Sequence, residues 1–83
     1  MPILHTSLSV VITKFPDHTA KIKRLFRENP NFYAQCEDYL RCSKALKFWE
    51  RSGTQNGLAR RDEYESILKD LESEILQSLN EYE

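Results

Sequence analysis

Hydrophobic residues recur every three or four positions along most of this chain, which is the spacing of one face of an α-helix. Two long segments share a finer pattern, in which the inward positions lie alternately four and three residues apart. These positions are Phe32, Cys36, Tyr39, Ser43, Leu46 and Glu50 in the first segment and Tyr64, Leu68, Leu71, Ile75, Ser78 and Tyr82 in the second. The pattern predicts an all-α protein with two long helices.

These two helices are predicted to pair as an antiparallel hairpin. They span residues 30–51 and 62–82, which are nearly equal lengths. Between them, residues 52–57 form a polar stretch with two Gly and no apolar residue, which favours a loop. Folding the chain back there places the inward positions in successive layers, with Leu46 opposite Leu68, as in an antiparallel coiled-coil-like pair.

A shorter helix is predicted before the hairpin, over about residues 15–28. Proline is tolerated at the first helical position, and the Asn29-Pro30 pair both ends this helix and starts the next one, with Asn29 as N-cap. Three apolar residues on one face of the short helix are expected to cover part of the hairpin: Ile22, Leu25 and Phe26.

Residues 7–13, with the sequence SLSVVIT, are rich in β-branched residues and partly alternate in polarity, which favours a short strand. The sequence holds no second strand candidate, so a strand here would be left unpaired or would pair with another molecule. We therefore predict a β-prone N-terminal arm over residues 1–14, either loose or in an intermolecular contact. A single helical domain is predicted over residues 15–83.

Charge is nearly balanced overall but unevenly distributed. The 83 residues carry a net charge of −1, which argues against a general polyanion-binding protein. Residues 1–61 nevertheless carry +6, whereas residues 62–83 carry −7. In the predicted register, the opposite charges of the two segments would neutralise each other through ion pairs between the two long helices. These pairs are Lys47 with Glu65, Lys44 with Asp70, and Arg41 with Glu72 and Glu74.

Few residues offer catalytic or metal-binding chemistry. Cys36 and Cys42 are six positions apart, about 120° around a helix, so they cannot share a metal or a disulfide. Neither His5 nor His18 completes a metal-ligand spacing, and we predict no metal and no cofactor. A nucleophilic pair of Cys42 and His18 would lack a third orienting group at a recognisable spacing, so we expect no enzyme activity.

The cysteine content also bears on location. Two cysteines are too few for the disulfide framework of a small secreted protein. No segment approaches the roughly 20 apolar residues that a membrane span requires. We therefore expect a cytoplasmic protein that is not bound to a membrane.

Several apolar residues fall outside the predicted layers of the hairpin, and something must cover them. The residues that we predict to bind a partner are Tyr33, Leu40, Phe48 and Trp49. Exposed apolar patches on small proteins mark contacts with other proteins. The sequence thus favours a non-enzymatic interaction module that self-associates as a homodimer. Such a module would act as an adaptor or small chaperone by also binding another protein. The alternative is that these residues only pack against the short helix.

A different class of function is suggested by the basic residues of the first long helix. They form a stripe beside the aromatic pair: Arg41, Lys44, Lys47 and Arg51. Cations and aromatic rings together can hold phosphates and stack bases, which would make the protein a nucleic-acid-associated regulator. We rank this alternative second, because the acidic second helix would lie alongside the stripe and repel a polyanion.

Some of these segments resemble a known family. The Phe15-Pro16-Asp17 start, the run Asn29-Pro30-Asn31-Phe32, the polar loop and the run LESEIL at residues 71–76 look like the YdcH-like small helical-hairpin proteins of bacteria. The resemblance covers about residues 15–79 and implies a short, self-associating hairpin of unassigned biochemical role. The β-prone arm and the Phe48-Trp49 pair depart from the family pattern, and no functional residue is carried over.

Overall fold

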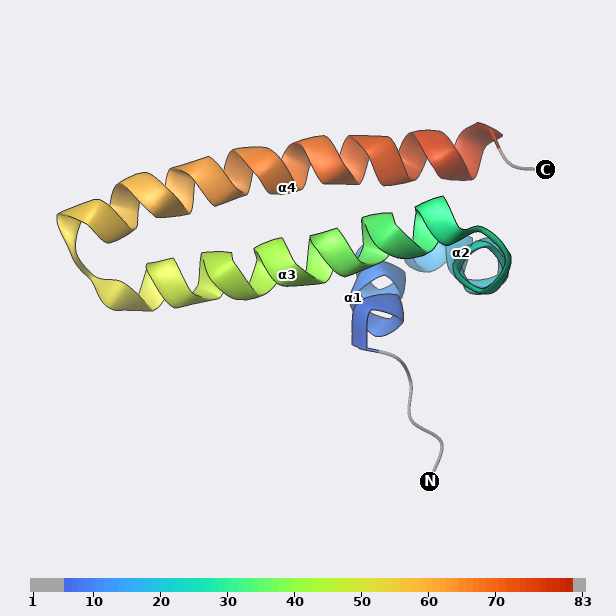
Figure 1. Cartoon of the computed structure of the whole chain (residues 1–83), viewed down its shortest axis with the longest axis horizontal. Coiled ribbons are helices and arrows are strands. Elements are labelled where there is room, and N and C mark those ends of the chain that lie inside the picture. Colours follow the sequence, from blue (N-terminus) through green and yellow to red (C-terminus); the bar gives the residue numbers. More distant parts are fainter. Residues whose placement is uncertain (1–5, 82–83) are drawn as a thin grey trace, which may run out of the picture.

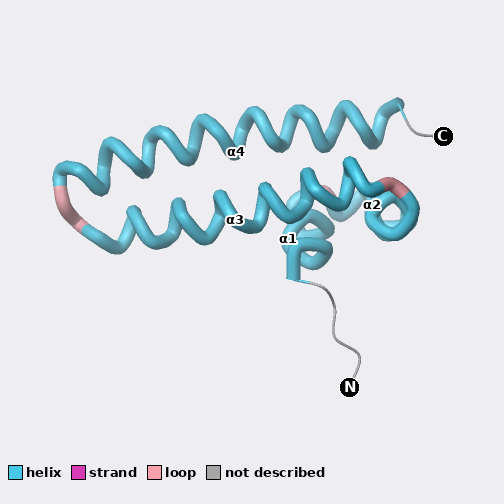
Figure 2. The backbone as a smooth tube through the Cα atoms, viewed as in Figure 1, coloured by secondary structure: helices cyan, strands magenta, loops and turns pink. Residues whose placement is uncertain are grey.

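The computed structural model describes residues 6–81, which are almost entirely helical (Figure 1). The elements in chain order are α1 (Thr6–Lys14), a short 3₁₀ turn η1 (Pro16–His18), α2 (Thr19–Glu28), α3 (Pro30–Ser52) and α4 (Gln55–Glu81). Helices α3 and α4 lie side by side and antiparallel, whereas α1 and α2 pack against one part of α3. The connections between helices are short (Figure 2). The predicted all-α class is confirmed.

The predicted strand over residues 7–13 is wrong, because these residues belong to α1. Val11 and Ser7 of this helix are fully buried, and α1 packs against both α2 and α3. A β-branched residue costs a helix only a few tenths of a kcal/mol, which is less than the stabilisation from burying its side chain. Burial therefore outweighs local preference here. Residues 1–5 of the predicted arm lie outside the described residues.

Asn29 separates α2 from α3 as predicted. Its side-chain Oδ1 accepts hydrogen bonds from the backbone N–H groups of Asn31 at 2.9 Å and Phe32 at 3.1 Å, which makes it the N-cap of α3. The residue before a proline avoids the helical region, and Asn29 accordingly has extended backbone with φ −118°. The short helix predicted over residues 15–28 begins instead as η1 and becomes an α-helix at Thr19.

The loop predicted over residues 52–57 is shorter than expected, and α4 begins at Gln55 instead of Asp62. Only Gly53 and Thr54 lie between the helices. Gly53 has φ +66°, a left-handed conformation that glycine adopts without strain and that ends α3. The Thr54 hydroxyl accepts a hydrogen bond from the backbone N–H of Gly57 at 3.0 Å and caps α4, so the helix starts earlier than the apolar pattern indicates.

The core occupies the half of the hairpin that α1 and α2 cover, which we call the proximal half (residues 30–43 and 68–81). The side chains with exposed fractions below 2% include two from α2 and others from α1, α3 and α4, namely Ile22, Leu25, Val11, Phe32, Cys36, Ile75 and Leu79. The remainder of the hairpin, residues 44–67, is the distal half. No side chain in this range is fully buried. The distal half is therefore two helices without a third layer (Figure 1).

Two side-chain hydrogen bonds cross the hairpin, one beside a predicted layer and one between two predicted layers. The Ser78 hydroxyl donates to Gln35 Oε1 at 3.2 Å, next to the expected Cys36 layer. One turn further along, the Tyr39 hydroxyl donates to Glu72 Oε2 at 2.7 Å. Lys21 of α2 donates to the Leu79 carbonyl at 3.0 Å, where the last carbonyls of α4 lack helical partners. The predicted Phe32–Tyr82 layer lies in part outside the described residues.

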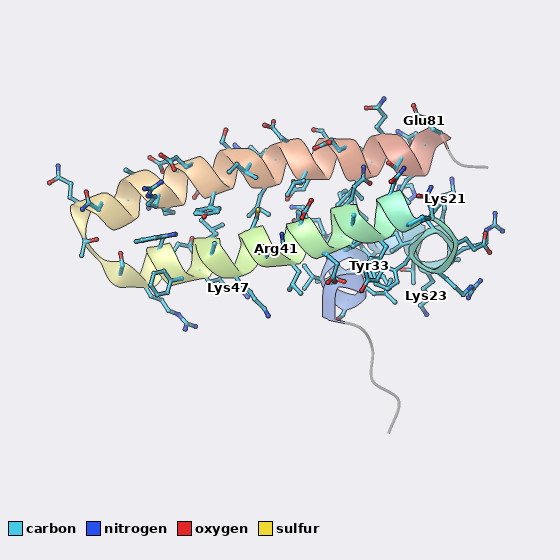
Figure 3. The ribbon with its side chains drawn as sticks, in the orientation of Figure 1. Lys21, Lys23, Tyr33, Arg41, Lys47 and Glu81 are labelled. Atoms are coloured by element: carbon cyan, nitrogen blue, oxygen red, sulfur yellow. The ribbon has the colours of Figure 1, made fainter. Side chains whose placement is uncertain are left out.

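The ion pairs predicted between the two long helices are not formed in the described chain. Arg41 pairs with Asp38 of its own helix at 3.3 Å, and Glu65 lies 3.9 Å from Arg61, also within one helix. Glu72 is paired, but with Lys14 of α1 at 3.5 Å. Figure 3 shows Lys47 on the side of α3 away from α4, which explains why it does not reach the acidic helix.

The described helices show neither a membrane span nor a cluster of metal ligands. Within residues 6–81, no helix combines the length and the apolar character that crossing a membrane requires. The same residues hold no group of three or more His, Cys, Asp or Glu side chains arranged to bind a metal ion.

Candidate functional site

An aromatic pair is the most exposed apolar feature of α3. Phe48 is 63% exposed, and Trp49 beside it is half-buried. Their ring centroids are 5.0 Å apart with an interplanar angle of 84°, an edge-to-face contact. Edge-to-face contact is one of the geometries that aromatic pairs favour. The pair thus places two aromatic side chains in contact in the distal half.

Cationic side chains surround Phe48. Together with Phe48 and Ser52, the side chains of Lys44, Lys47 and Arg51 line a surface depression of about 530 Å³, which we call the Phe48 surface. The three cations lie at helical spacings of three and four residues, so they share one side of α3. In the described chain none of the three forms an ion pair with a carboxylate. The Phe48 surface is therefore both apolar and uncompensated in charge.

A second hollow continues this surface toward α1. Val10, Thr13 and Lys14 of α1 face α3 residues across a crevice of about 440 Å³, with Leu40 among the apolar groups on the α3 side. Lys44 and Lys47 line this crevice as well as the Phe48 surface. The two hollows are thus adjacent and share their cationic border.

Trp49 contributes to a different side of the hairpin. It lines a hollow of about 620 Å³ with residues of the turn and of α4: Thr54, Asn56, Ala59, Arg60 and Glu63. Ile67, four residues after Glu63, lies on the same face of α4 and is 42% exposed. Cys42 and Ala45, at seven and four residues before Trp49, share its face of α3. We call this combination the Trp49 face.

The structure does not unite the four residues that the sequence predicted as a partner site. Tyr33 lies in the proximal half with its ring 4.8 Å from that of Phe26, and Leu40 is half-buried in the α1–α3 crevice. Phe48 and Trp49 touch each other but point to different sides of the distal half. Tyr33 and Phe48 are about 22 Å apart along the helix axis at 1.5 Å per residue.

Three of the four predicted basic residues do converge. Lys44, Lys47 and Arg51 line the Phe48 surface, whereas Arg41 pairs with Asp38 outside it. Val10 and Lys14 were not predicted as site residues, because residues 1–14 were predicted as a β-prone arm. The helical spacing of Leu8, Val11 and Phe15 is the signal that could have placed α1 beside α3.

Neither cysteine has the properties of a nucleophile. Burial, and to a smaller extent the charge of Glu37, raises the pKa of the Cys36 thiol to about 12. Burial and the nearby Asp38 also raise the pKa of Cys42, and Arg41 only partly opposes this effect. Both groups are therefore protonated thiols at neutral pH, whereas nucleophilic attack requires the thiolate.

Comparisons with known proteins give no further identification. No protein-family model, no curated protein and no solved structure matches this chain. The resemblance to YdcH-like proteins therefore remains a prediction from the sequence. The geometry of the Phe48 surface and the Trp49 face is the basis on which function is inferred.

Proposed function

We propose that this protein is a non-enzymatic interaction module, a helical hairpin that self-associates as a homodimer and acts as an adaptor or small chaperone in the cytoplasm. One observation carries the proposal: the distal half, residues 44–67, has no fully buried side chain. Three large apolar residues there are more than 40% exposed, namely Phe48, Leu58 and Ile67. Covering them requires a second molecule.

The Trp49 face, which lies in the distal half except for Cys42, fits a second copy. It carries Trp49 and Ile67 with the small side chains of Cys42 and Ala45, which allow close approach of another helix. Fully burying one large apolar side chain contributes about 1.5 to 3 kcal/mol. A two-fold dimer buries each of these residues twice, which is the usual arrangement of small homo-oligomers.

The proposal is tested by the solution mass of the protein in sedimentation experiments over a concentration series. Ile67→Arg places a charge in the proposed interface and should weaken dimerisation at least tenfold without loss of helicity by circular dichroism. Leu76→Arg is the matched control, because Leu76 has a similar exposed fraction, 39% against 42%, but shares the face of Glu72. A wild-type protein that stays monomeric at all concentrations would refute self-association.

The nucleic-acid alternative retains one supporting observation. Lys44, Lys47 and Arg51 surround the exposed ring of Phe48, an arrangement that suits a stacked base between phosphate contacts. The alternative predicts binding of single-stranded oligonucleotides that weakens steeply with salt. We rank the nucleic-acid alternative second, because the exposed carboxylate of Glu50 on the same helix and the net charge of −1 repel a polyanion.

A further inference from the structure

We propose that the Phe48 surface and the adjoining α1–α3 crevice form one docking groove for an acidic amphipathic helix of a different protein. This inference rests on the proposed role as an interaction module and adds the chemistry of the partner. The groove lies on the side of α3 away from the Trp49 face, so it stays open in the proposed homodimer.

The charge of the groove selects an acidic occupant. Lys44, Lys47 and Arg51 border it, and in the described residues none of them pairs with a carboxylate. Lys14 at the α1 end is neutralised by Glu72 at 3.5 Å. Three clustered cations repel one another, so a carboxylate placed between them would be attracted to all three. Charge complementarity of this kind also accelerates encounter with a partner.

The apolar groups of the groove select a helical occupant. Val10 and Leu40 provide apolar contacts at the α1 end, and Phe48 provides one about 12 Å further along α3 at 1.5 Å per residue. A helix lying along α3 meets this spacing with apolar residues at positions i, i+4 and i+8. Acidic residues on the flanks of such a helix would then face the lysines. Leu40 to Arg51 spans about 17 Å, or three helical turns.

A second copy of this chain does not fit the groove in a two-fold dimer. Most carboxylates of α4 are already paired with a cation, including Glu65 with Arg61 at 3.9 Å. The exposed acidic residues that remain in the middle of α4 are Asp70 and Glu74. Each lies two residues from Glu72, which is about 200° around the helix axis. Since Glu72 contacts Lys14 on the groove side, Asp70 and Glu74 face the opposite side of the hairpin. A two-fold axis pairs like faces, so it cannot bring these residues to the partner's groove.

The inference is tested with a fluorescent synthetic peptide of about 14 residues, with leucines at i, i+4 and i+8 and glutamates between them. Fluorescence anisotropy should show binding that weakens with added salt. A peptide with lysine in place of glutamate should not bind. The Lys44→Ala, Lys47→Ala double variant and Phe48→Ser should each weaken binding at least tenfold.

The matched control is the Lys23→Ala, Arg27→Ala double variant, which removes the same charge from exposed positions of α2, outside the groove. Figure 3 places Lys23 on α2, away from the Phe48 surface. The affinity of this control variant for the acidic peptide should stay within twofold of that of the wild type. Equal losses in both double variants would show only a general effect of net charge and would overturn the inference.

Two further outcomes separate this inference from the proposed function. If the protein dimerises but does not bind the acidic peptide, the docking groove is refuted and the proposed interaction module is supported. A monomer that binds the peptide through Lys44 and Phe48 would refute self-association and support the groove. Binding of a single-stranded oligonucleotide at the same residues, without binding of the peptide, would replace the inference by the nucleic-acid alternative.

Discussion

The hydroxyl of Tyr39 in α3 donates a hydrogen bond to Oε2 of Glu72 in α4, with 2.7 Å between the two oxygens. Lys14 of α1 approaches the same carboxylate oxygen at 3.5 Å. One carboxylate thus joins three helices at the boundary between the covered and uncovered halves of the hairpin. The side chain of Glu72 is only 26% exposed, so water replaces these contacts incompletely.

Removing the Tyr39 hydroxyl should destabilise the protein measurably. Tyr39→Phe leaves the ring packed but takes the donor from Glu72, and hydrogen bonds to charged groups contribute about 1.5 to 3 kcal/mol. Because Glu72 is partly exposed, we expect a loss of about 1 to 2 kcal/mol in urea unfolding. Tyr64→Phe, which changes another half-buried tyrosine, should stay within about 0.5 kcal/mol of the wild type. Equal effects of the two variants would contradict this role of Tyr39.

Stability should fall at alkaline pH. Burial, with a smaller effect of Glu37, raises the pKa of Cys36 from its ordinary 9.0 to about 12. Burial, followed by the hydrogen bond to Glu72 and its charge, also raises the pKa of Tyr39. The unfolded chain therefore loses these protons first, so the stabilisation is present below pH 9 and is lost as the pH rises through the folded-state pKa values.

Urea unfolding between pH 8 and 11 measures this effect. Between the pKa of the unfolded state and that of the folded state, each such group lowers the free energy of unfolding by about 1.4 kcal/mol per pH unit. Cys36→Ala should flatten the slope from about pH 9 upward, whereas Cys42→Ala should flatten it less, because Cys42 is only half-buried. A slope that neither variant changes would show that other groups control the alkaline transition.

Helix α1 should contribute directly to stability. Val11 is fully buried, and Val11→Ala removes two methyl groups from a filled site, which should cost about 2 kcal/mol in the free energy of unfolding. Val10 lies on the partly buried side of the same helix, so Val10→Ala should lower the free energy of unfolding by less than about 1 kcal/mol. If both variants unfold like the wild type, α1 does not belong to the core.

Gly57 should resist replacement although it lies within a helix. Alanine normally stabilises a helix by about 1 kcal/mol relative to glycine. A Cβ at this position, however, would overlap the Ser52 hydroxyl and lie 3.2 Å from the Trp49 carbonyl oxygen. We expect Gly57→Ala to lower the melting temperature. The same change in a Ser52→Ala background should cost less, which a double-mutant cycle would detect.

Much of the fold could be predicted from the sequence, where the signal is local. The end of α2, the N-cap at Asn29 and the course of α3 follow from the chemistry of Asn29-Pro30 and from apolar periodicity. The start of α4 could not be placed, because residues 55–61 contain one large apolar residue, Leu58, and so show no apolar period. The helix there begins at the Thr54 cap. Composition alone does not reveal such a cap.

The sequence by itself determined that the chain forms helices, that α3 and α4 repeat inward positions every three or four residues, and that basic and acidic residues separate along the chain. Only the tertiary structure decided that α1 is a helix, because burying Val11 outweighs a weak preference for a strand. The tertiary structure also placed Lys47 on the side of α3 away from the acidic helix (Figure 3). Side-chain direction depends on which faces the neighbouring helices occupy, and the groove beside Phe48 exists because α1 packs against one half of α3 and leaves the other open.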